Sequence, residues 1–182
     1  MPFEFRRLGI PDLVLIGSKR FGDARGFFQE AWHKGAFEAA GIPGPFVQIN
    51  WSRSRKGALR GLHFQKPPKA QGKLLMVLKG EIYDVAVDIR KGSPTYGKWE
   101  AVTLSEAKGE MLYVPPGFAH GFCVTSEEVD VLYQVTADYA PDLDRGILWN
   151  DLALSIPWPE ARPELSPKDA KLPLLRDADN PF

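Results

Sequence analysis

The sequence predicts an all-β fold, an antiparallel β-sandwich or barrel with a few short helices, in one domain that spans residues 1–182. Short apolar stretches recur along the chain, and turn residues separate them, which is typical of antiparallel sheets. A chain of 182 residues is long enough for one sizeable core and short for two. The 17 glycines and 16 prolines are spread along the chain, so they give no sign of a linker.

Two neighbouring strands give the clearest pattern. Lys73 to Leu78 and Glu81 to Ile89 flank the pair Lys79-Gly80, which predicts a tight turn between antiparallel strands. In the second strand alternate residues face opposite sides of the sheet, so Asp84 shares a side with Ile82. Further strands are predicted at Trp99–Leu104, Met111–Val114, Gly121–Val124 and Val129–Thr136.

Helix signals are few. Residues Trp32 to Ala40 predict a short helix that ends at Gly41. The segment Ser166-Pro167-Lys168-Asp169 has the order of a helix N-terminus, with a capping residue, a proline and an acid. Because an acid at this position commonly belongs to a capping box, the local pattern alone favours a structural role for Asp169. The tail from Leu172 to Phe182 is predicted to be irregular.

Positive charge is concentrated in one stretch of a chain that is neutral overall. Lys plus Arg and Asp plus Glu both total 23, a balance unlike that of a general nucleic-acid-binding protein. No acid occurs between Glu38 and Glu81, and we favour a small phosphorylated ligand as the reason. The alternatives are a solvated face whose charges pair with distant acids, and a nucleic-acid groove in which Trp51 and Phe64 stack. The cations are Arg53, Arg55, Lys56, Arg60, Lys66, Lys69, Lys73 and Lys79.

Cysteine content and hydropathy bear on the compartment. The single cysteine, Cys123, has no intramolecular disulfide partner, which fits a reducing cytoplasm. The first residues lack the apolar core of a signal peptide, and the longest aliphatic run, Leu74 to Leu78, is far shorter than a membrane span. We therefore expect a cytoplasmic protein without membrane contact.

Two histidine-containing segments resemble motifs of the cupin superfamily, which implies a jelly roll. Pro115-Pro116-Gly117-Phe118-Ala119-His120 fits the second motif, and Gly61-Leu62-His63-Phe64-Gln65 lies where the first would supply two histidines. Gln65 stands in place of the second histidine, and the glutamate expected near Lys69 is missing. Two histidines beside Lys69 and Lys73 are too few donors for a cation, so we expect no metal and no cofactor.

Collinear segments from about residue 20 to 170 resemble the dTDP-4-dehydrorhamnose 3,5-epimerase family. A match of this extent is far more specific than any single motif within it. The segments are Phe21-Gly-Asp23-Ala-Arg25-Gly26-Phe27-Phe28-Gln29-Glu30, Gln48-Ile-Asn50-Trp-Ser52-Arg-Ser54, Leu59-Arg60-Gly61-Leu62-His63-Phe64-Gln65, Gln71-Gly72-Lys73-Leu74, Asp84-Val85-Ala86-Val87-Asp88-Ile89-Arg90, Ser93-Pro94-Thr95-Tyr96-Gly97, Pro116-Gly117-Phe118-Ala119-His120-Gly121-Phe122, Trp149-Asn150-Asp151 and Leu165-Ser166-Pro167-Lys168-Asp169.

The resemblance implies an isomerase and assigns four catalytic residues. The expected reaction epimerises C3 and C5 of dTDP-4-dehydro-6-deoxy-D-glucose to dTDP-4-dehydro-L-rhamnose, through an enolate and without metal, in dTDP-L-rhamnose biosynthesis. By resemblance, His63 removes the carbon-bound proton and Asp169 orients it. Tyr133 is the acid on the opposite face of the sugar, and Lys73 contacts the keto oxygen.

The resemblance also implies a nucleotide-sugar site and a homodimer. In the family, amino-terminal strands join the partner's sheet, and the alternation of apolar and charged residues from Pro2 to Arg7 is compatible with that. Asp144 stands where the family usually has glutamate, which puts that contact in doubt. The implied contacts to the dTDP-linked substrate are Arg25, Glu30, Gln48, Asn50, Arg60, Lys73, His120, Asp144 and Lys168.

The chemistry explains why a base alone is insufficient. The pKa of a C–H group beside a carbonyl is roughly a dozen units above the pKa of an imidazolium. Proton transfer to the imidazole is therefore uphill by a free energy on the order of 16 kcal/mol. General-base catalysis supplies only about 10²–10⁴-fold in rate, so the forming oxyanion must also be stabilised. Lys73 is a suitable cation for that purpose. Without the resemblance, Lys73 would be read as solvated, and Tyr133 as a core or interface residue.

Three alternative functions remain open. A single-site epimerase that acts at C3 or C5 only would use the same base and pocket. A non-catalytic sugar-binding jelly roll would need no proton donor opposite His63. A metal-dependent cupin dioxygenase or isomerase would contradict the ligand count given above.

Overall fold

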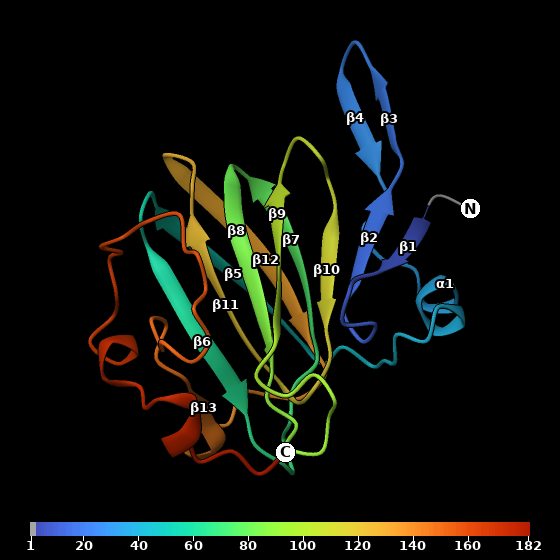
Figure 1. The fold of residues 1–182 in the computed structure, drawn as a ribbon. Helices are drawn as coiled ribbons and strands as arrows, with labels where there is room; N and C mark the ends of the chain where they lie inside the picture. Colours follow the sequence, from blue (N-terminus) through green and yellow to red (C-terminus); the bar gives the residue numbers. More distant parts are fainter. Residues whose placement is uncertain (1–2) are drawn as a thin grey trace.

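Two packed antiparallel sheets and a projecting hairpin form the computed structural model, which describes residues 3–182 (Figure 1). The first sheet contains β1 (Phe3–Arg7), β2 (Val14–Ser18), β5 (Gln48–Arg55), β7 (Lys73–Lys79), β10 (Met111–Val114) and β12 (Glu128–Val135). The second sheet contains β6 (Leu59–Gln65), β8 (Glu81–Asp88), β9 (Trp99–Ser105), β11 (Phe118–Val124) and β13 (Asp144–Gly146). The remaining elements are the hairpin strands β3 (Arg20–Asp23) and β4 (Gly26–Gln29), helix α1 (Lys34–Ala39) and the 3₁₀ turns η1 (Pro141–Leu143), η2 (Asp169–Lys171) and η3 (Leu175–Asp177).

Strand order confirms the predicted antiparallel sandwich. The six-stranded sheet has the order β1-β2-β10-β7-β12-β5, and the five-stranded sheet has the order β13-β6-β11-β8-β9. Neighbours in both sheets run antiparallel. Met1 and Pro2 lie outside the described residues, so the amino-terminal alternation is described only from Phe3 onward.

Alternate residues of strand β8 face opposite sides of the sheet, as predicted. Both sides of the strand are buried. Ile82 and Ala86 face the core between the sheets, where they join Leu75 and Val131 of the other sheet. Residues on the opposite side of β8, including Val85, belong to a second cluster that the carboxyl-terminal segment covers. The chain after β13 therefore seals the outer face of the five-stranded sheet.

Helix α1 is shorter than predicted. The predicted Trp32–Ala40 helix is observed as α1, which begins at Lys34 because the side chain of His33 caps it and accepts a hydrogen bond from the backbone N–H of Ala36. Gly41 follows with a φ of +78°, a left-handed conformation that ends the helix. Phe37 of α1 packs with residues of β2, β7 and β10, so the helix covers the outer face of the six-stranded sheet.

Strands β6 and β11 approach each other unusually closely at Gly61 and Gly121. A Cβ atom on Gly61 would lie 2.5 Å from the Cα atom of Gly121, and Gly61 has a φ of +132°. For both reasons, any larger residue at position 61 would strain the backbone or clash with Gly121. Next to this contact His63 and His120 are direct cross-strand partners, and the register shifts just beyond them. The glycine contact thus sets how the two histidine-bearing strands align.

We predict that Gly61→Ala lowers the free energy of unfolding by roughly 3 kcal/mol, because it adds overpacking to a left-handed backbone. Urea denaturation would measure the change. Gly92→Ala is the matched control, since nothing lies within 4 Å of its Cβ position. Equal stability of the two variants would contradict the importance of this contact.

Candidate active site

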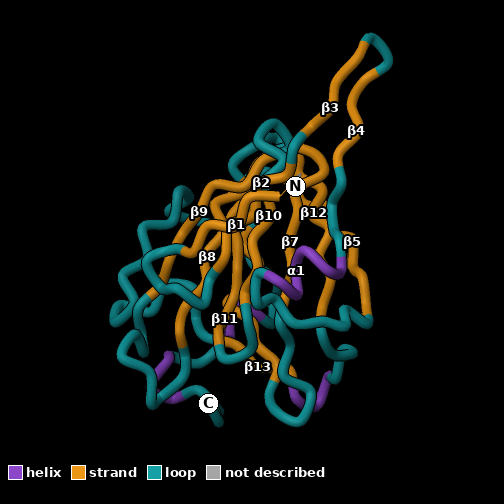
Figure 2. Tube along the Cα trace, turned by 90° about the vertical axis from the view of Figure 1, so that its right-hand side faces the viewer, coloured by secondary structure: helices purple, strands orange, loops and turns teal. Residues whose placement is uncertain are grey.

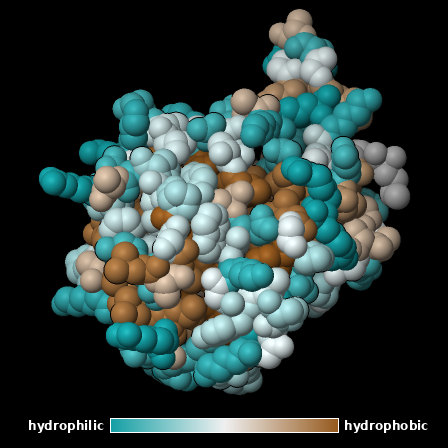
Figure 3. All heavy atoms as spheres, in the orientation of Figure 1, coloured by the Kyte–Doolittle hydropathy of each residue, from teal (hydrophilic) through white to brown (hydrophobic). Residues whose placement is uncertain are grey.

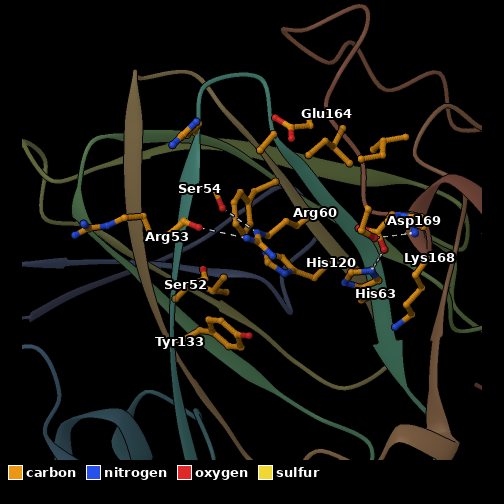
Figure 4. A pocket seen from close by; sticks show the side chains of 18 of the residues that line it. Ser52, Arg53, Ser54, Arg60, His63, His120, Tyr133, Glu164, Lys168 and Asp169 are labelled. Carbon is orange, nitrogen blue, oxygen red and sulfur yellow. Dashed lines mark hydrogen bonds and ion pairs between the residues drawn. The ribbon is translucent and has the colours of Figure 1, made fainter.

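A cavity of about 930 Å³ opens between the two sheets, and both sheets supply its walls (Figure 4). His63 on β6 and His120 on β11 line one wall. Tyr133 on β12 and Ser52 on β5 line the other. The segment around Asp169 closes one side. Residues predicted for catalysis from distant parts of the sequence therefore meet in one space.

His63 is hydrogen-bonded to a buried carboxylate. Its Nε2 atom lies 2.6 Å from Oδ1 of Asp169, whose side chain is only 4% exposed against 30% for His63. Burial raises the pKa of Asp169, but the hydrogen bond and charge of His63, with the Gly61 backbone and Ser166, bring it below its usual value. An ionised carboxylate accepts the Nε2 proton, so the lone pair of neutral His63 resides on Nδ1.

Asp169 combines the capping geometry and the histidine contact. The hydroxyl of Ser166 accepts a hydrogen bond from the backbone N–H of Asp169 at 3.0 Å, as the capping pattern predicts. The element that follows is the 3₁₀ turn η2 instead of an α-helix. The carboxylate itself points to His63, so the capping residue holds the acid in place for a contact outside the turn.

A second histidine–carboxylate pair lies beside the first. Nε2 of His120 lies 2.9 Å from both carboxylate oxygens of Asp84, and both side chains are buried. Asp84 shares the core-facing side of β8 with Ile82, as the alternation predicts, but the family resemblance assigns it no role. The periodicity of the strand was the available signal, because it put a carboxylate among inward-facing apolar residues.

Lys73 lines the same cavity as the two histidines. Its Nζ donates to the backbone oxygen of His63 at 3.4 Å. Burial lowers the pKa of Lys73 to about 8, against the opposing effect of the negative charges of Asp144 and Asp84. Lys73 is therefore mostly cationic at neutral pH, although its pKa is only about one unit above that pH.

Tyr133 faces the histidines from the opposite sheet. It is the cross-strand partner of Asn50, and its side chain lines the same cavity as His63. Burial raises the pKa of Tyr133, while the charge of Arg60 lowers it by less. The phenol therefore stays protonated near neutral pH and can donate a proton.

Most cations of the basic stretch are paired with acids, and four of the eight line the cavity, including the paired Arg53. Five of its eight members form ion pairs with acids from distant segments, as the alternative of a solvated face predicted. Within residues 3–182, Arg55, Arg60 and Lys73 have no acid within ion-pair distance, and all three line the cavity. The stretch as a whole is thus not one anion site. The paired cations are Arg53, Lys56, Lys66, Lys69 and Lys79.

Arg60 is held by the neighbouring strand. Its Nε donates to the hydroxyl of Ser54 at 2.9 Å, and its guanidinium also donates to the backbone oxygen of Arg53. These bonds fix the guanidinium against the β5 wall of the cavity (Figure 4). A fixed cation of this type suits a phosphate group.

Other predicted contacts form a network at the cavity edge. The Gln48 side chain donates to Asn50 and accepts from the backbone N–H of Tyr139. The hydroxyl of Tyr139 donates to Asp144, which also binds Lys168. Lys168 lines the cavity, whereas Gln48, Asn50 and Asp144 lie outside its lining. Sequence reasoning missed Tyr139, which connects the two halves of this network.

The hairpin residues Arg25 and Glu30 are not brought to this cavity. Arg25 lies in the turn between β3 and β4, where its exposed side chain pairs with Asp23. The hairpin projects away from the sheets, and Figure 2 shows the same projection from the side. Neither Arg25 nor Glu30 lines the cavity.

The positions that would complete a cupin metal site have other roles. The amide of Gln65 donates to the backbone oxygens of Lys69 and Asp138 and accepts from the N–H of Ala140, so it holds two loops together. Among residues 3–182, no three His, Cys, Asp or Glu side chains gather as a metal site would require.

Phe64, one proposed stacking ring, is buried in the core and offers no face to a nucleic acid.

A family model described as dTDP-4-dehydrorhamnose 3,5-epimerase matches residues 7–177 of the chain. The chain belongs to the dTDP-4-dehydrorhamnose 3,5-epimerase family. A relative of that name from Shigella flexneri is 50% identical over 171 residues, which cover 93% of this chain and 94% of the relative. One from Pseudomonas aeruginosa is 50% identical over 175 residues, with 95% and 96% covered.

Solved structures of dTDP-4-dehydrorhamnose 3,5-epimerase family members have the same fold. An enzyme from Legionella pneumophila, in complex with dTDP-4-keto-L-rhamnose, matches with a TM-score of 0.93 and 46% identity over 96% of this chain and 93% of that one. An enzyme from Bacillus anthracis, with TDP and PPi bound, matches with a TM-score of 0.92 and 48% identity over 94% and 99%. In residues 3–182 of this family member, every helix is too short or too polar to cross a membrane.

We predict that Lys73→Met raises the free energy of unfolding at pH 7 by up to about 3 kcal/mol. The reason is that it removes a buried cation, and burial lowers the pKa of this lysine from 10.5 to about 8. Below pH 8 both states of the wild type bind this proton, and the native state bears the full cost of the buried charge. Between pH 8 and 10.5 the native state releases the proton first, so wild-type stability rises and the difference between the proteins shrinks.

Urea unfolding of both proteins across this pH range would measure the effect. Lys34→Met is the control, because Lys34 is exposed on α1 and its replacement should change stability by less than about 0.5 kcal/mol. A Lys73→Met protein less stable than the wild type at pH 7 would contradict the prediction.

Proposed function

We propose that this family member epimerises C3 and C5 of a dTDP-linked 4-keto-6-deoxy sugar, with His63 as base and Tyr133 as acid. One observation carries the assignment of these roles: the two side chains come from opposite sheets and line the same cavity. A sugar ring between them would present one face to an imidazole and the other to a phenol. Inversion of a carbon centre requires proton removal and return on opposite faces.

The base in this proposal is Nδ1 of His63. The C–H bond beside the carbonyl breaks, its proton moves to Nδ1, and its electron pair delocalises onto the keto oxygen. Asp169 holds the other nitrogen at 2.6 Å, which fixes the tautomer and stabilises the imidazolium that forms. Asp169 is a positioning residue in this scheme.

Lys73 stabilises the enolate oxygen in this proposal, and His120 lines the space beside it. At pH 7 Lys73 is mostly charged, since its pKa is about 8, and its attraction to the oxygen strengthens as negative charge develops. His120 lies on the strand next to His63 and faces the same space. Tyr133 then transfers its hydroxyl proton to the opposite face of the carbon. The phenolate regains a proton from solvent, and the imidazolium of His63 releases its proton to solvent.

The remaining predicted residues would hold the nucleotide diphosphate. Arg60 and Lys168 line the cavity and supply positive charge, while Gln48 and Asn50 supply polar groups beside it. Asp144, shorter than the glutamate expected there, retains contacts to Lys168 and Tyr139. The bound dTDP-4-keto-L-rhamnose of the Legionella pneumophila enzyme supports a dTDP-linked substrate.

The relatives favour epimerisation at both carbons. Those at about 50% identity are 3,5-epimerases, whereas a 3-epimerase from Streptomyces niveus is 38% identical. A double mutant of a 3'-monoepimerase from Streptomyces bikiniensis replaces one histidine and one tyrosine, which lie as far apart in its sequence as His63 and Tyr133 do here. From the relatives at about 50% identity we infer that the product is dTDP-4-dehydro-L-rhamnose, in dTDP-L-rhamnose biosynthesis. One epimerase domain over residues 1–182 carries this activity.

We further propose a homodimer in which the hairpin of one protomer completes the site of the other. Phe21, Phe27 and Phe28 of the hairpin are 50%, 57% and 67% exposed. In the space-filling view the hairpin stands clear of the rest of the molecule (Figure 3). Neither Arg25 nor Glu30 lines its own cavity, so their predicted contacts to substrate need a second protomer. Ile49 and Trp51 on the edge strand β5 add exposed apolar surface for such an interface.

The reaction is tested by turnover of dTDP-4-keto-6-deoxyglucose in D₂O, followed by NMR. The wild type should incorporate deuterium at both C3 and C5, and label at one carbon only would identify a single-site epimerase. His63→Ala should slow the exchange by about 10²–10⁴-fold, because the base is lost. Tyr133→Phe should retain exchange but lose inverted product, since it can remove the proton but not return it from the other face.

Loss of exchange in Tyr133→Phe to the same extent as in His63→Ala would contradict the division of roles. Ser105→Ala, a change on β9 away from the cavity, serves as the control for handling and folding.

The dimer is tested by mixing two inactive variants. His63→Ala and Arg25→Ala should each be impaired, and after subunit exchange about a quarter of the sites should regain both residues. Mixing His63→Ala with Tyr133→Phe is the control, because both residues belong to one protomer's cavity and no complete site can form. Activity that stays at the level of the separate variants would overturn the proposal of a shared site.

A further inference from the structure

Strand β5 carries a strip of inward-facing polar side chains, of which Ser52 and Ser54 line the cavity. Alternate residues Gln48, Asn50, Ser52 and Ser54 share one face of the strand, and Tyr133 is the cross-strand partner of Asn50. Three of the four have protein partners. Gln48 and Asn50 bond each other, and Ser54 accepts from Arg60.

Ser52 is the exception in this strip. Across residues 3–182 its hydroxyl is the one buried side-chain polar atom without a hydrogen-bond partner. Such groups are rare in native proteins, because a hydroxyl removed from water without a compensating bond costs free energy. Ser54, two residues away on the same face, shows that the strand can satisfy a serine through Arg60.

The position of Ser52 indicates the kind of partner it lacks. The residue lines the cavity and lies between Tyr133 and Arg60 (Figure 4). His63 and Tyr133 define the sugar position in the proposed function, and Arg60 is the fixed cation beyond it. The group that links the sugar to the nucleotide must pass between these two points, next to Ser52. That group carries oxygen atoms with negative charge and therefore accepts hydrogen bonds.

We propose that the hydroxyl of Ser52 is a ligand of the substrate diphosphate and donates a hydrogen bond to a phosphate oxygen beside Arg60. Rotation about the single side-chain torsion turns the hydroxyl toward the cavity. The strip then presents Ser52 as donor and Arg60 as cation to the same phosphate, while Ser54 holds the guanidinium in place. This inference rests on the proposed function, since it requires a nucleotide-linked substrate.

Binding of dTDP, measured by calorimetry without turnover, separates this inference from the reaction itself. Ser52→Ala should weaken dTDP binding by roughly 10- to 100-fold, as expected for a hydrogen bond to a charged group. Binding of thymidine, which has no phosphate, should be unchanged. With the sugar nucleotide, KM should rise with the loss of dTDP affinity, and D₂O exchange at saturation should persist.

A matched pair of variants isolates the hydroxyl from side-chain shape. Threonine and valine have the same shape, so Ser52→Thr should bind dTDP at least about tenfold more tightly than Ser52→Val if the hydroxyl is the ligand. Thermal melts would confirm that both variants are folded.

Two outcomes would overturn the inference. Equal dTDP affinity of the wild type and Ser52→Ala would mean that the hydroxyl has no ligand role. Unchanged dTDP affinity with a raised KM for the sugar nucleotide would place the contact on the sugar instead of the diphosphate. If the wild type binds dTDP but turns over no 4-keto sugar, the proposed function fails while the Ser52 contact is still measured.

Discussion

The spacing of the two sheets is the constraint on which the site depends. Packed sheets lie about 10 Å apart, and side chains from both normally fill that layer. Over most of the sandwich Leu75, Ile82 and Val131 do so. Toward β5 and β6 the inward positions carry serines, histidines and a lysine, which leave a cavity of about 930 Å³. Groups that must act on opposite faces of one substrate can then stand on opposite sheets.

The charges in this cavity are arranged before any substrate enters. Asp169 and Asp84 are each buried against a single imidazole, and those imidazoles lie on neighbouring strands. Lys73 adds a cation. Burial lowers the pKa of Lys73 to about 8, and the negative charges of nearby acids oppose this lowering. An environment already fixed in this way can stabilise a developing oxyanion without reorganising during the reaction. The predicted destabilisation by the buried lysine is a common cost of such sites.

Local sequence patterns predicted the strands well because alternation and turn residues are local signals. The predicted turn at Gly80 and the strand from Glu81 are observed, and the predicted Gly121–Val124 strand begins earlier, at Phe118, directly after Gly117. Ion pairs were not predictable in the same way. Lys66 pairs with Asp179, an acid more than a hundred residues away, so only the fold reveals which cations remain for the cavity. The family resemblance, and not the local pattern, selected Tyr133 and Asp169.

The capping and catalytic interpretations of Asp169 are compatible, because one depends on the other. Ser166 fixes the backbone of Asp169, and the carboxylate thereby reaches His63. This segment is irregular, and next to Asp169 it is joined to the sheet by the parallel bridge between Ala58 and Glu164. Irregular segments open more readily than sheet cores. The alignment of the proposed base thus depends on how firmly the carboxyl-terminal segment docks, and loosening there should impair proton removal before the sandwich itself unfolds.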